Sequence, residues 1–314
     1  MHALVTGATG FVGGRLARRL RQQGEQVRCL VRDPGGAAAR ALVEAGFEIH
    51  VGDVLRPDTL AGAGNGINVG YYLVHSMGRG HDDSDFADQE RRAAEGFARM
   101  AQQEGIARVI YLGGLGDRPG SKHLRSRHET AKQLEAHGPP LTYFRAGMIV
   151  GSESESYRTL RYLVERLPAM IAPAWLSTKT QPIGIDDVLS YLTQAPHVEA
   201  SAGRELQIGG PDVLTYGEML DAMALALGKI PRPKVPVPFI TPWLSSLWIG
   251  LVTPVDTNIA RALIEGLSTE TVVTDDSARQ LFDIEPAPFE ATLRQALAED
   301  TESRWRGRHS DVRA

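Results

Sequence analysis

The first apolar strand of this chain leads directly into a glycine-rich turn. Residues 3–14 read ALVTGATGFVGG, in which Gly7, Gly10 and Gly13 form a G-x-x-G-x-x-G pattern, and residues 15–20 continue at helical spacing. A strand, a glycine turn and a helix in this order predict a site for the pyrophosphate of a dinucleotide, because the start of the helix offers free N–H groups and a positive dipole end. We expect Gly7 to permit the turn, Gly10 to let the pyrophosphate approach, and Gly13 to allow close packing of helix and strand.

The composition is typical of a globular protein with a sizeable core. The 314 residues are 42% hydrophobic and 23% charged. The formal net charge of −4 gives no reason to expect a nucleic-acid partner. The single cysteine, Cys29, excludes an intrachain disulfide, and the histidines and acidic residues show no metal-ligand spacing, so no metal site is predicted. Met1 leads into the first strand without a basic segment before it, which favours a cytoplasmic protein.

Strands and helices alternate in the first half of the chain. The strand candidates are 2–6, 26–31, 48–51, 69–74, 108–112 and 142–145, and the helical patterns are 11–23, 37–45, 86–104 and 126–137. This alternation predicts a Rossmann-type α/β fold, a doubly wound parallel sheet with its ligand at the carboxyl ends of the strands. We expect this domain over 1–151, with 178–210 returning to it through a strand at 205–208. Asp186 or Asp187 is expected to cap the helix within that return.

In the rest of the chain, prolines are dense and the helical patterns are short. This pattern predicts a smaller, mostly helical substrate-binding region formed by 152–177 and 211–300, followed by a polar tail at 301–314. Prolines interrupt the apolar segment 238–252, which is short for a bilayer span. It is interpreted as a buried helix or pocket wall, with a membrane contact or a subunit interface as the alternatives. The oligomeric state stays open.

Residues at the strand ends are candidates for cofactor contacts. Arg32 follows the second strand and favours the 2′-phosphate of NADP(H), whereas an acidic residue in that place would favour NAD(H), which remains the alternative. Asp53, followed by Val54, either accepts a hydrogen bond from the adenine amino group or caps the short helix near 56–60. His75 is either a packed polar group or a proton donor. The other expected contacts lie in the glycine turn and at the later strand ends: Thr9, Phe11, Val12, Leu73, Val74, Gly113, Ala146 and Gly147.

The motifs together resemble those of the short-chain dehydrogenase/reductase superfamily. They are TGATGFVG, the Val-Arg end of the second strand, the Gly-Asp pair that ends in Asp53, YYLVHSMG at 71–78, and IGGPD at 208–212. Within the superfamily, the chain resembles the atypical, NmrA-like members, over most of its length to about residue 270. The resemblance implies an NADP(H)-dependent oxidoreductase with a small-molecule substrate. Its alternatives are a catalytically silent NAD(P)H-binding redox sensor or assembly factor, and a nucleotide-sugar epimerase.

The usual catalytic motif of that superfamily is absent. Ordinary members carry a serine or threonine after the fifth strand and Tyr-x-x-x-Lys on the next helix. In this chain, Gly113 replaces the serine or threonine, and His123-x-x-x-Arg127 replaces Tyr-x-x-x-Lys. Residues spaced i, i+4 share one helix face, and the pair resembles an atypical subgroup with His-x-x-x-Arg. Arg127 would then hold the ribose hydroxyls and His123 would donate a proton. Alternatively, the basic run 122–128 is a solvated or anion-binding face.

Overall fold

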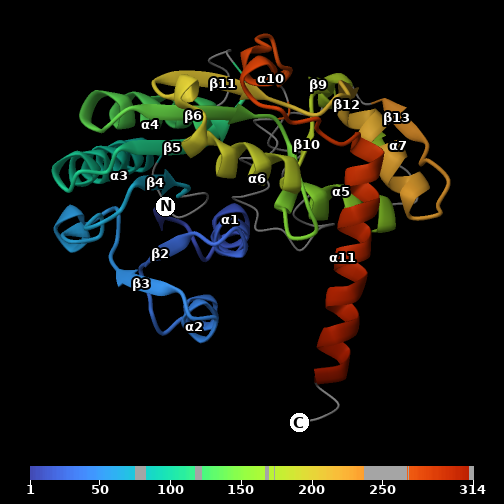
Figure 1. The fold of residues 1–314 in the computed structure, drawn as a ribbon. Helices are drawn as coiled ribbons and strands as arrows, with labels where there is room; N and C mark the ends of the chain where they lie inside the picture. Colours follow the sequence, from blue (N-terminus) through green and yellow to red (C-terminus); the bar gives the residue numbers. More distant parts are fainter. Residues whose placement is uncertain are drawn as a thin grey trace.

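The computed structural model describes residues 1–74, 83–116, 122–166, 170–172, 174–236, 267 and 269–310 (Figure 1). Its centre is a seven-stranded sheet of order β11-β6-β5-β4-β1-β2-β3, in which all neighbouring strands are parallel. The strands are β1 (His2–Val5), β2 (Gln26–Val31), β3 (Glu48–Val51), β4 (Val69–Tyr72), β5 (Arg108–Gly114), β6 (Leu141–Ala146) and β11 (Arg204–Ile208). This order confirms the expected Rossmann-type sheet. Its switch point, where such folds bind ligands, lies between β1 and β4.

Helices cover both faces of the sheet. They are α1 (Phe11–Gln22), α2 (Ala37–Glu44), α3 (Asp83–Gln103), α4 (Lys122–His137) and α6 (Ile185–Gln194), with short 3-10 helices η1 (Pro57–Leu60), η3 (Ala195–His197) and η4 (Glu199–Ser201). α1 packs beside α6, and α3 packs beside α4 (Figure 1). Each of the first four helices begins at its expected first residue or a few residues before it. The apolar residues whose spacing predicted these helices form the helix face that packs on the sheet.

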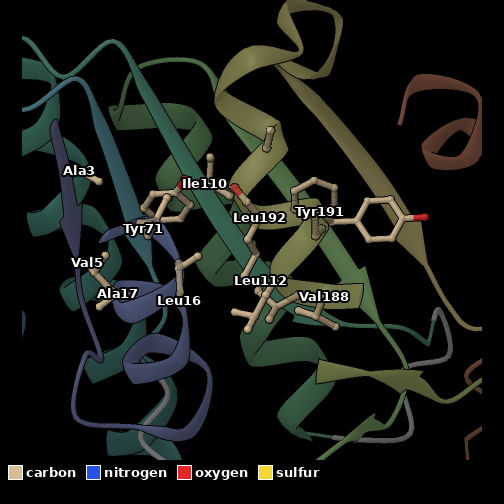
Figure 2. Packing of buried hydrophobic residues seen from close by; sticks show 14 of the residues in the cluster. Ala3, Val5, Leu16, Ala17, Tyr71, Ile110, Leu112, Val188, Tyr191 and Leu192 are labelled. Atoms are coloured by element: carbon tan, nitrogen blue, oxygen red, sulfur yellow. Dashed lines mark hydrogen bonds between the residues drawn. The ribbon is translucent and has the colours of Figure 1, made fainter. Parts of the chain in front are cut away.

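The two faces of the sheet bury separate apolar clusters. Successive strand residues point to opposite faces, so Tyr71 and Tyr72 of β4 enter different clusters. Tyr71 is fully buried, its hydroxyl donates to the Leu192 carbonyl of α6 at 3.1 Å, and Figure 2 shows Leu16 of α1 in the same cluster. On the other face, the Tyr72 ring lies 5.1 Å from the Phe97 ring of α3. These contacts hold the sheet between two helical layers and so fix the strand ends that surround the site.

A third apolar cluster lies beyond the main sheet. It joins α5 (Glu155–Arg166), the 3-10 helix η2 (Ala174–Ser177), α7 (Tyr216–Ala226) and α11 (Phe289–Ser310). α7 begins with a capping box, in which the Thr215 hydroxyl accepts the Glu218 N–H and the Glu218 carboxylate accepts the Thr215 N–H. Ion pairs join α11 to α1 through Arg15 and Glu299, and to α5 through Arg161 and Asp300.

Short strand pairs connect this cluster to the sheet. They are β7 (Ile149–Val150) with β10 (Ile183–Gly184), β9 (Lys179–Thr180) with β12 (Leu214–Thr215), and β8 (Met170–Ala172) with β13 (Lys234–Pro236). A short helix, α10 (Ser277–Leu281), packs against β11.

The expected cap of α6 is wrong. The N-cap is Gly184, without a side-chain hydrogen bond. Asp186 and Asp187 lie in the first turn, where their charge suits the helix dipole, and they accept hydrogen bonds from the Gln295 side chain at 2.6 Å and from the Ala287 N–H at 3.1 Å. Asp186 therefore binds α11 itself, and Asp187 binds the segment that leads into it.

Two further expectations concern the end of the chain and the apolar segment. Residues 301–310, expected as part of a polar tail, continue helix α11 to Ser310. None of the helices within the described ranges is long and apolar enough to cross a bilayer. The segment 238–252 lies outside the described residues.

Candidate functional site

The glycine turn between β1 and α1 has the geometry of a phosphate cradle. Gly7 has φ +65°, and a Cβ there would lie 2.5 Å from the Leu73 carbonyl oxygen. A Cβ on Gly13 would lie 2.3 Å from the Gly7 carbonyl oxygen. Gly10 differs, because a Cβ there would have only the Gly7 carbonyl oxygen nearby, at 3.2 Å. Thus Gly7 and Gly13 are required by the packing of the turn, whereas Gly10 leaves space open at the N-terminus of α1.

A cavity of about 770 Å³ extends from this turn. That volume lies within the range of cofactor and ligand sites. It brings together most of the residues expected to contact a cofactor, which come from the turn, β4, β5, α4 and the end of β6: Gly7, Thr9, Gly10, Phe11, Val12, Gly13, Leu73, Gly113, Arg127, Ala146 and Gly147.

Other expected residues are placed differently. Arg32 is exposed, and Arg32, Asp53, Val54 and Val74 are not among the residues that line the cavity. The Asp53 carboxylate accepts the Leu55 N–H at 3.1 Å in a local turn, and η1 has no side-chain cap, so the capping interpretation of Asp53 is wrong. An adenine contact of Asp53 stays a prediction.

Two histidines fall outside what can be described. His75 lies outside the described residues, and so does the side chain of His123, whose backbone belongs to α4. A catalytic role for His123 and the alternatives for His75 therefore remain predictions.

Arg18 is a cavity residue that the sequence motifs did not reveal. It projects from α1 and lines the cavity together with Ala38 and Leu42 of α2. Its Nη1 donates to the Gly14 carbonyl at 3.3 Å, and no carboxylate in the described part of the chain pairs with it. The sequence feature that could have indicated Arg18 is its position, one helical turn after Gly14, on the helix face toward β2.

Arg127 is a second cationic residue that lines the cavity. It projects from α4, and the Tyr111 hydroxyl of β5 donates to its backbone carbonyl at 3.2 Å, which fixes this turn of the helix above the sheet. Among the described residues, no carboxylate forms an ion pair with Arg127, so its guanidinium can bind a ligand's hydroxyl or phosphate oxygens.

Gly113 stands where ordinary members of the superfamily that the sequence resembles have a serine or threonine, and the packing explains the glycine. A Cβ at Gly113 would lie 2.8 Å from both Cε2 and the hydroxyl oxygen of Tyr143. The Tyr143 ring stacks on Tyr111 with centroids 5.0 Å apart, so it has little freedom to move. The Tyr143 side chain therefore occupies the space that a serine at 113 would need.

The far end of the cavity is an apolar chamber built from segments distant in sequence. Its lining comes from the chain after β6 and from α5, η2 and α7, with one further leucine: Met148, Leu160, Leu163, Trp175, Leu220 and Leu267. Tyr216 and Thr271 add hydroxyl groups to it. Sequence reasoning expected a substrate region here but missed these individual residues, since no local motif marks them.

The chain is similar to proteins of known activity. Residues 7–161 match the NAD(P)H-binding family. The chain is 25% identical over 294 residues to the mitochondrial "NADH dehydrogenase [ubiquinone] 1 alpha subcomplex subunit 9" of Arabidopsis thaliana, a match that covers 88% of this chain and 72% of that protein. It is 24% identical over 229 residues to the "NAD(P)H azoreductase" of Xenophilus azovorans, with 72% and 74% covered. Because the first relative is mitochondrial, the cytoplasmic location stays a prediction.

A solved structure shares the whole fold. The NADPH-dependent quinone oxidoreductase of Escherichia coli, complexed with NADPH, superimposes with a TM-score of 0.72 at 18% identity, covering 93% of this chain and 98% of that one. This likeness extends over both the sheet and the region that forms the chamber. Residues 7–161 belong to the NAD(P)H-binding family, and the chain has the same fold as that oxidoreductase.

Proposed function

We propose that this chain is an NADP(H)-dependent oxidoreductase that transfers hydride to or from a small, largely apolar organic substrate. The observation that carries this proposal is that one cavity has the glycine turn, Arg127 and the residues of the apolar chamber in its lining. A cofactor and a substrate bound in one such cavity are held in a fixed orientation, which removes much of the entropic cost of their reaction.

The residues present fit a dinucleotide. Gly10 leaves the N-terminus of α1 open, and the first turn of that helix carries no acidic side chain. Bound NADPH would supply a hydride from its nicotinamide ring. We expect the glycine turn to hold the pyrophosphate, Arg127 to hold the ribose hydroxyls, Ala146 and Gly147 to lie against the nicotinamide, and His123 to donate the proton.

The preference for NADP(H) rests on Arg32 and gains support from Arg18. Arg32 follows β2, exposed and without an ion pair among the described residues.

Replacing Arg32 with alanine should weaken NADPH binding by about 1.5–3 kcal/mol, roughly 10- to 100-fold, through loss of a charge-assisted contact, and should leave NADH binding unchanged. Titrations with both cofactors test this. Arg99→Ala is the control, since Arg99 is an exposed arginine of α3 that pairs with Glu95 and does not line the cavity.

In the unmodified protein, NADPH should bind more tightly than NADH. Equal or tighter binding of NADH would contradict a 2′-phosphate contact at Arg32. If instead the Arg32 variant keeps the preference and an Arg18→Ala variant loses it, the 2′-phosphate contact belongs to α1.

The apolar chamber favours an uncharged, conjugated acceptor. Near Leu160, Leu163 and Trp175 the described lining contains no cation, which a nucleoside diphosphate would need. The azoreductase and the quinone oxidoreductase to which the chain is similar act, by their names, on azo compounds and on quinones. The chamber therefore supports a reductase over a nucleotide-sugar epimerase.

The second candidate is a catalytically silent NAD(P)H-binding protein. The resemblance to a subunit of a respiratory complex favours it, as does the glycine at position 113 in place of a serine. Such a protein would bind NADPH and NADP⁺ without turnover.

A panel of acceptors separates these functions. We expect the unmodified protein to oxidise NADPH with quinones or azo dyes and not to interconvert UDP-glucose and UDP-galactose. For Arg127→Ala we expect weaker cofactor binding together with slower turnover. Tight NADPH binding with no oxidation by any quinone, azo compound, enone, ketone or imine would contradict the reductase and favour the silent binder.

A further inference from the structure

A group of three hydroxyls that the proposed cofactor contacts do not use lies beside the chamber. Tyr216, at the start of α7, and Thr271 both line the cavity. Thr180 of β9 is fully buried, and its Oγ1 lies 2.7 Å from Oγ1 of Thr271. The Tyr216 hydroxyl interacts with the hydroxyls of both threonines. The three side chains form one connected cluster, which we call the hydroxyl cluster.

The hydroxyl cluster lies at the end of the sheet where the nicotinamide is expected. The Thr271 carbonyl accepts the Gln181 N–H at 2.9 Å, and the Thr271 N–H donates to the Lys179 carbonyl at 3.1 Å, so the backbone is held on both sides. A Cβ on Gly147 would lie 3.2 Å from the Thr271 carbonyl oxygen. The cluster thus borders the end of β6 on one side and the apolar chamber on the other.

The chemistry of Tyr216 suits a neutral hydrogen-bond donor. Burial raises the pKa of Tyr216 to about 12, partly offset by its interactions with Thr180 and Thr271, so the hydroxyl keeps its proton over the physiological range. The Tyr216 ring packs edge-on to Trp175 with centroids 6.0 Å apart, which fixes its direction. Because Tyr216 is buried, a hydrogen bond from its hydroxyl is stronger than it would be in water.

We propose that Tyr216, oriented by Thr271 and Thr180, donates a hydrogen bond to the oxygen of a conjugated carbonyl substrate of the quinone type. This inference rests on the proposed reductase function and adds the substrate class. The substrate gains a hydride from NADPH and one proton, which His123 donates and then recovers from the solvent. The products are NADP⁺ and the reduced substrate, and Tyr216 keeps its own proton. The apolar chamber holds the hydrocarbon part, and the hydroxyl cluster fixes the oxygen and stabilises it as it gains negative charge.

The test compares Tyr216→Phe with a matched control. The control is Tyr157→Phe, because Tyr157 is a fully buried tyrosine in the same apolar cluster but does not line the cavity. The first readout is binding of 1,4-naphthoquinone to the protein loaded with NADP⁺, by calorimetry, where no hydride is present. The second readout is kcat/KM for NADPH oxidation by the same quinone. Titration with NADPH shows that each variant is folded.

We expect Tyr216→Phe to weaken quinone binding about fivefold and to lower kcat/KM about 100-fold, with unchanged NADPH affinity. Tyr157→Phe should leave both quinone readouts unchanged. Thr271→Val should give a smaller loss that does not add to that of Tyr216→Phe, since the threonine acts through the tyrosine.

The outcomes separate this inference from the proposed function. If the unmodified protein reduces naphthoquinone and Tyr216→Phe matches it in both readouts, the role of Tyr216 is overturned and the reductase stands. If azo dyes are reduced but naphthoquinone neither binds nor reacts, the carbonyl substrate class is overturned. If no acceptor reacts and naphthoquinone does not bind, both the inference and the proposed function fail.

Discussion

Replacing Gly10 with valine is expected to abolish NADPH binding while the protein stays folded. Gly10 has φ −94° and ψ 176°, an extended conformation that any residue adopts, so the backbone tolerates the change. A Cβ at this position meets only the Gly7 carbonyl oxygen, at 3.2 Å, and otherwise enters open space. The valine methyl groups would fill the space that the pyrophosphate needs. We expect a loss of at least about 100-fold in affinity, roughly 3 kcal/mol or more, measured by calorimetric titration with NADPH.

Gly13→Val is the matched comparison for this prediction. Its Cβ would lie 2.3 Å from the Gly7 carbonyl oxygen, so this substitution should lower Tm and disturb the turn itself. Circular dichroism separates the two effects. A folded Gly10→Val protein that binds NADPH as tightly as the unmodified chain would show that the glycine pattern serves only as a turn.

Replacing His123 with alanine is expected to lower turnover by about 10²–10⁴-fold, the usual effect of losing a proton donor. NADPH affinity should change little, because the proposed ribose contact belongs to Arg127. Arg127→Ala should reduce affinity and turnover together. Steady-state kinetics with an active acceptor and NADPH titrations of both variants test this division of roles.

His128→Ala is the control, since His128 is an exposed histidine of the same helix, α4. It should resemble the unmodified protein in both measurements. If turnover survives the His123 substitution, His123 has no part in the proton transfer, and the basic run of α4 is better explained as an anion-binding face.

Local patterns were sufficient to predict the first half of the fold. The apolar strands and the helix periodicity follow the chain directly. The glycine pattern at 7–13 predicted the turn, and Gly13 could be explained locally because its contacts are with Gly7 and Ala8, whereas Gly7 approaches Leu73 of a distant segment. The parallel order of the sheet followed from strand–helix alternation and right-handed crossovers.

Features that depend on contacts between distant residues could not be predicted in this way. Gly113 is explained by the Tyr143 ring, which is on the neighbouring strand β6 and comes close only through the register of β5 with β6. Tyr216 and Thr271 meet because β9 pairs with β12 and with the segment at Thr271. The two aspartates at the start of α6 bind residues about a hundred positions away instead of capping the helix.

A single-turnover experiment tests the central claim, that the cavity carries out hydride transfer. The protein is loaded with NADPH below the concentration of sites and mixed rapidly with excess 1,4-naphthoquinone or an azo dye, while the absorbance of the reduced nicotinamide is followed. The reductase predicts that the bound NADPH is oxidised completely, one acceptor molecule being reduced for each NADPH, and that Gly10→Val shows no such phase. Bound NADPH that remains reduced with every acceptor would contradict the account and leave a protein that binds the cofactor without using it.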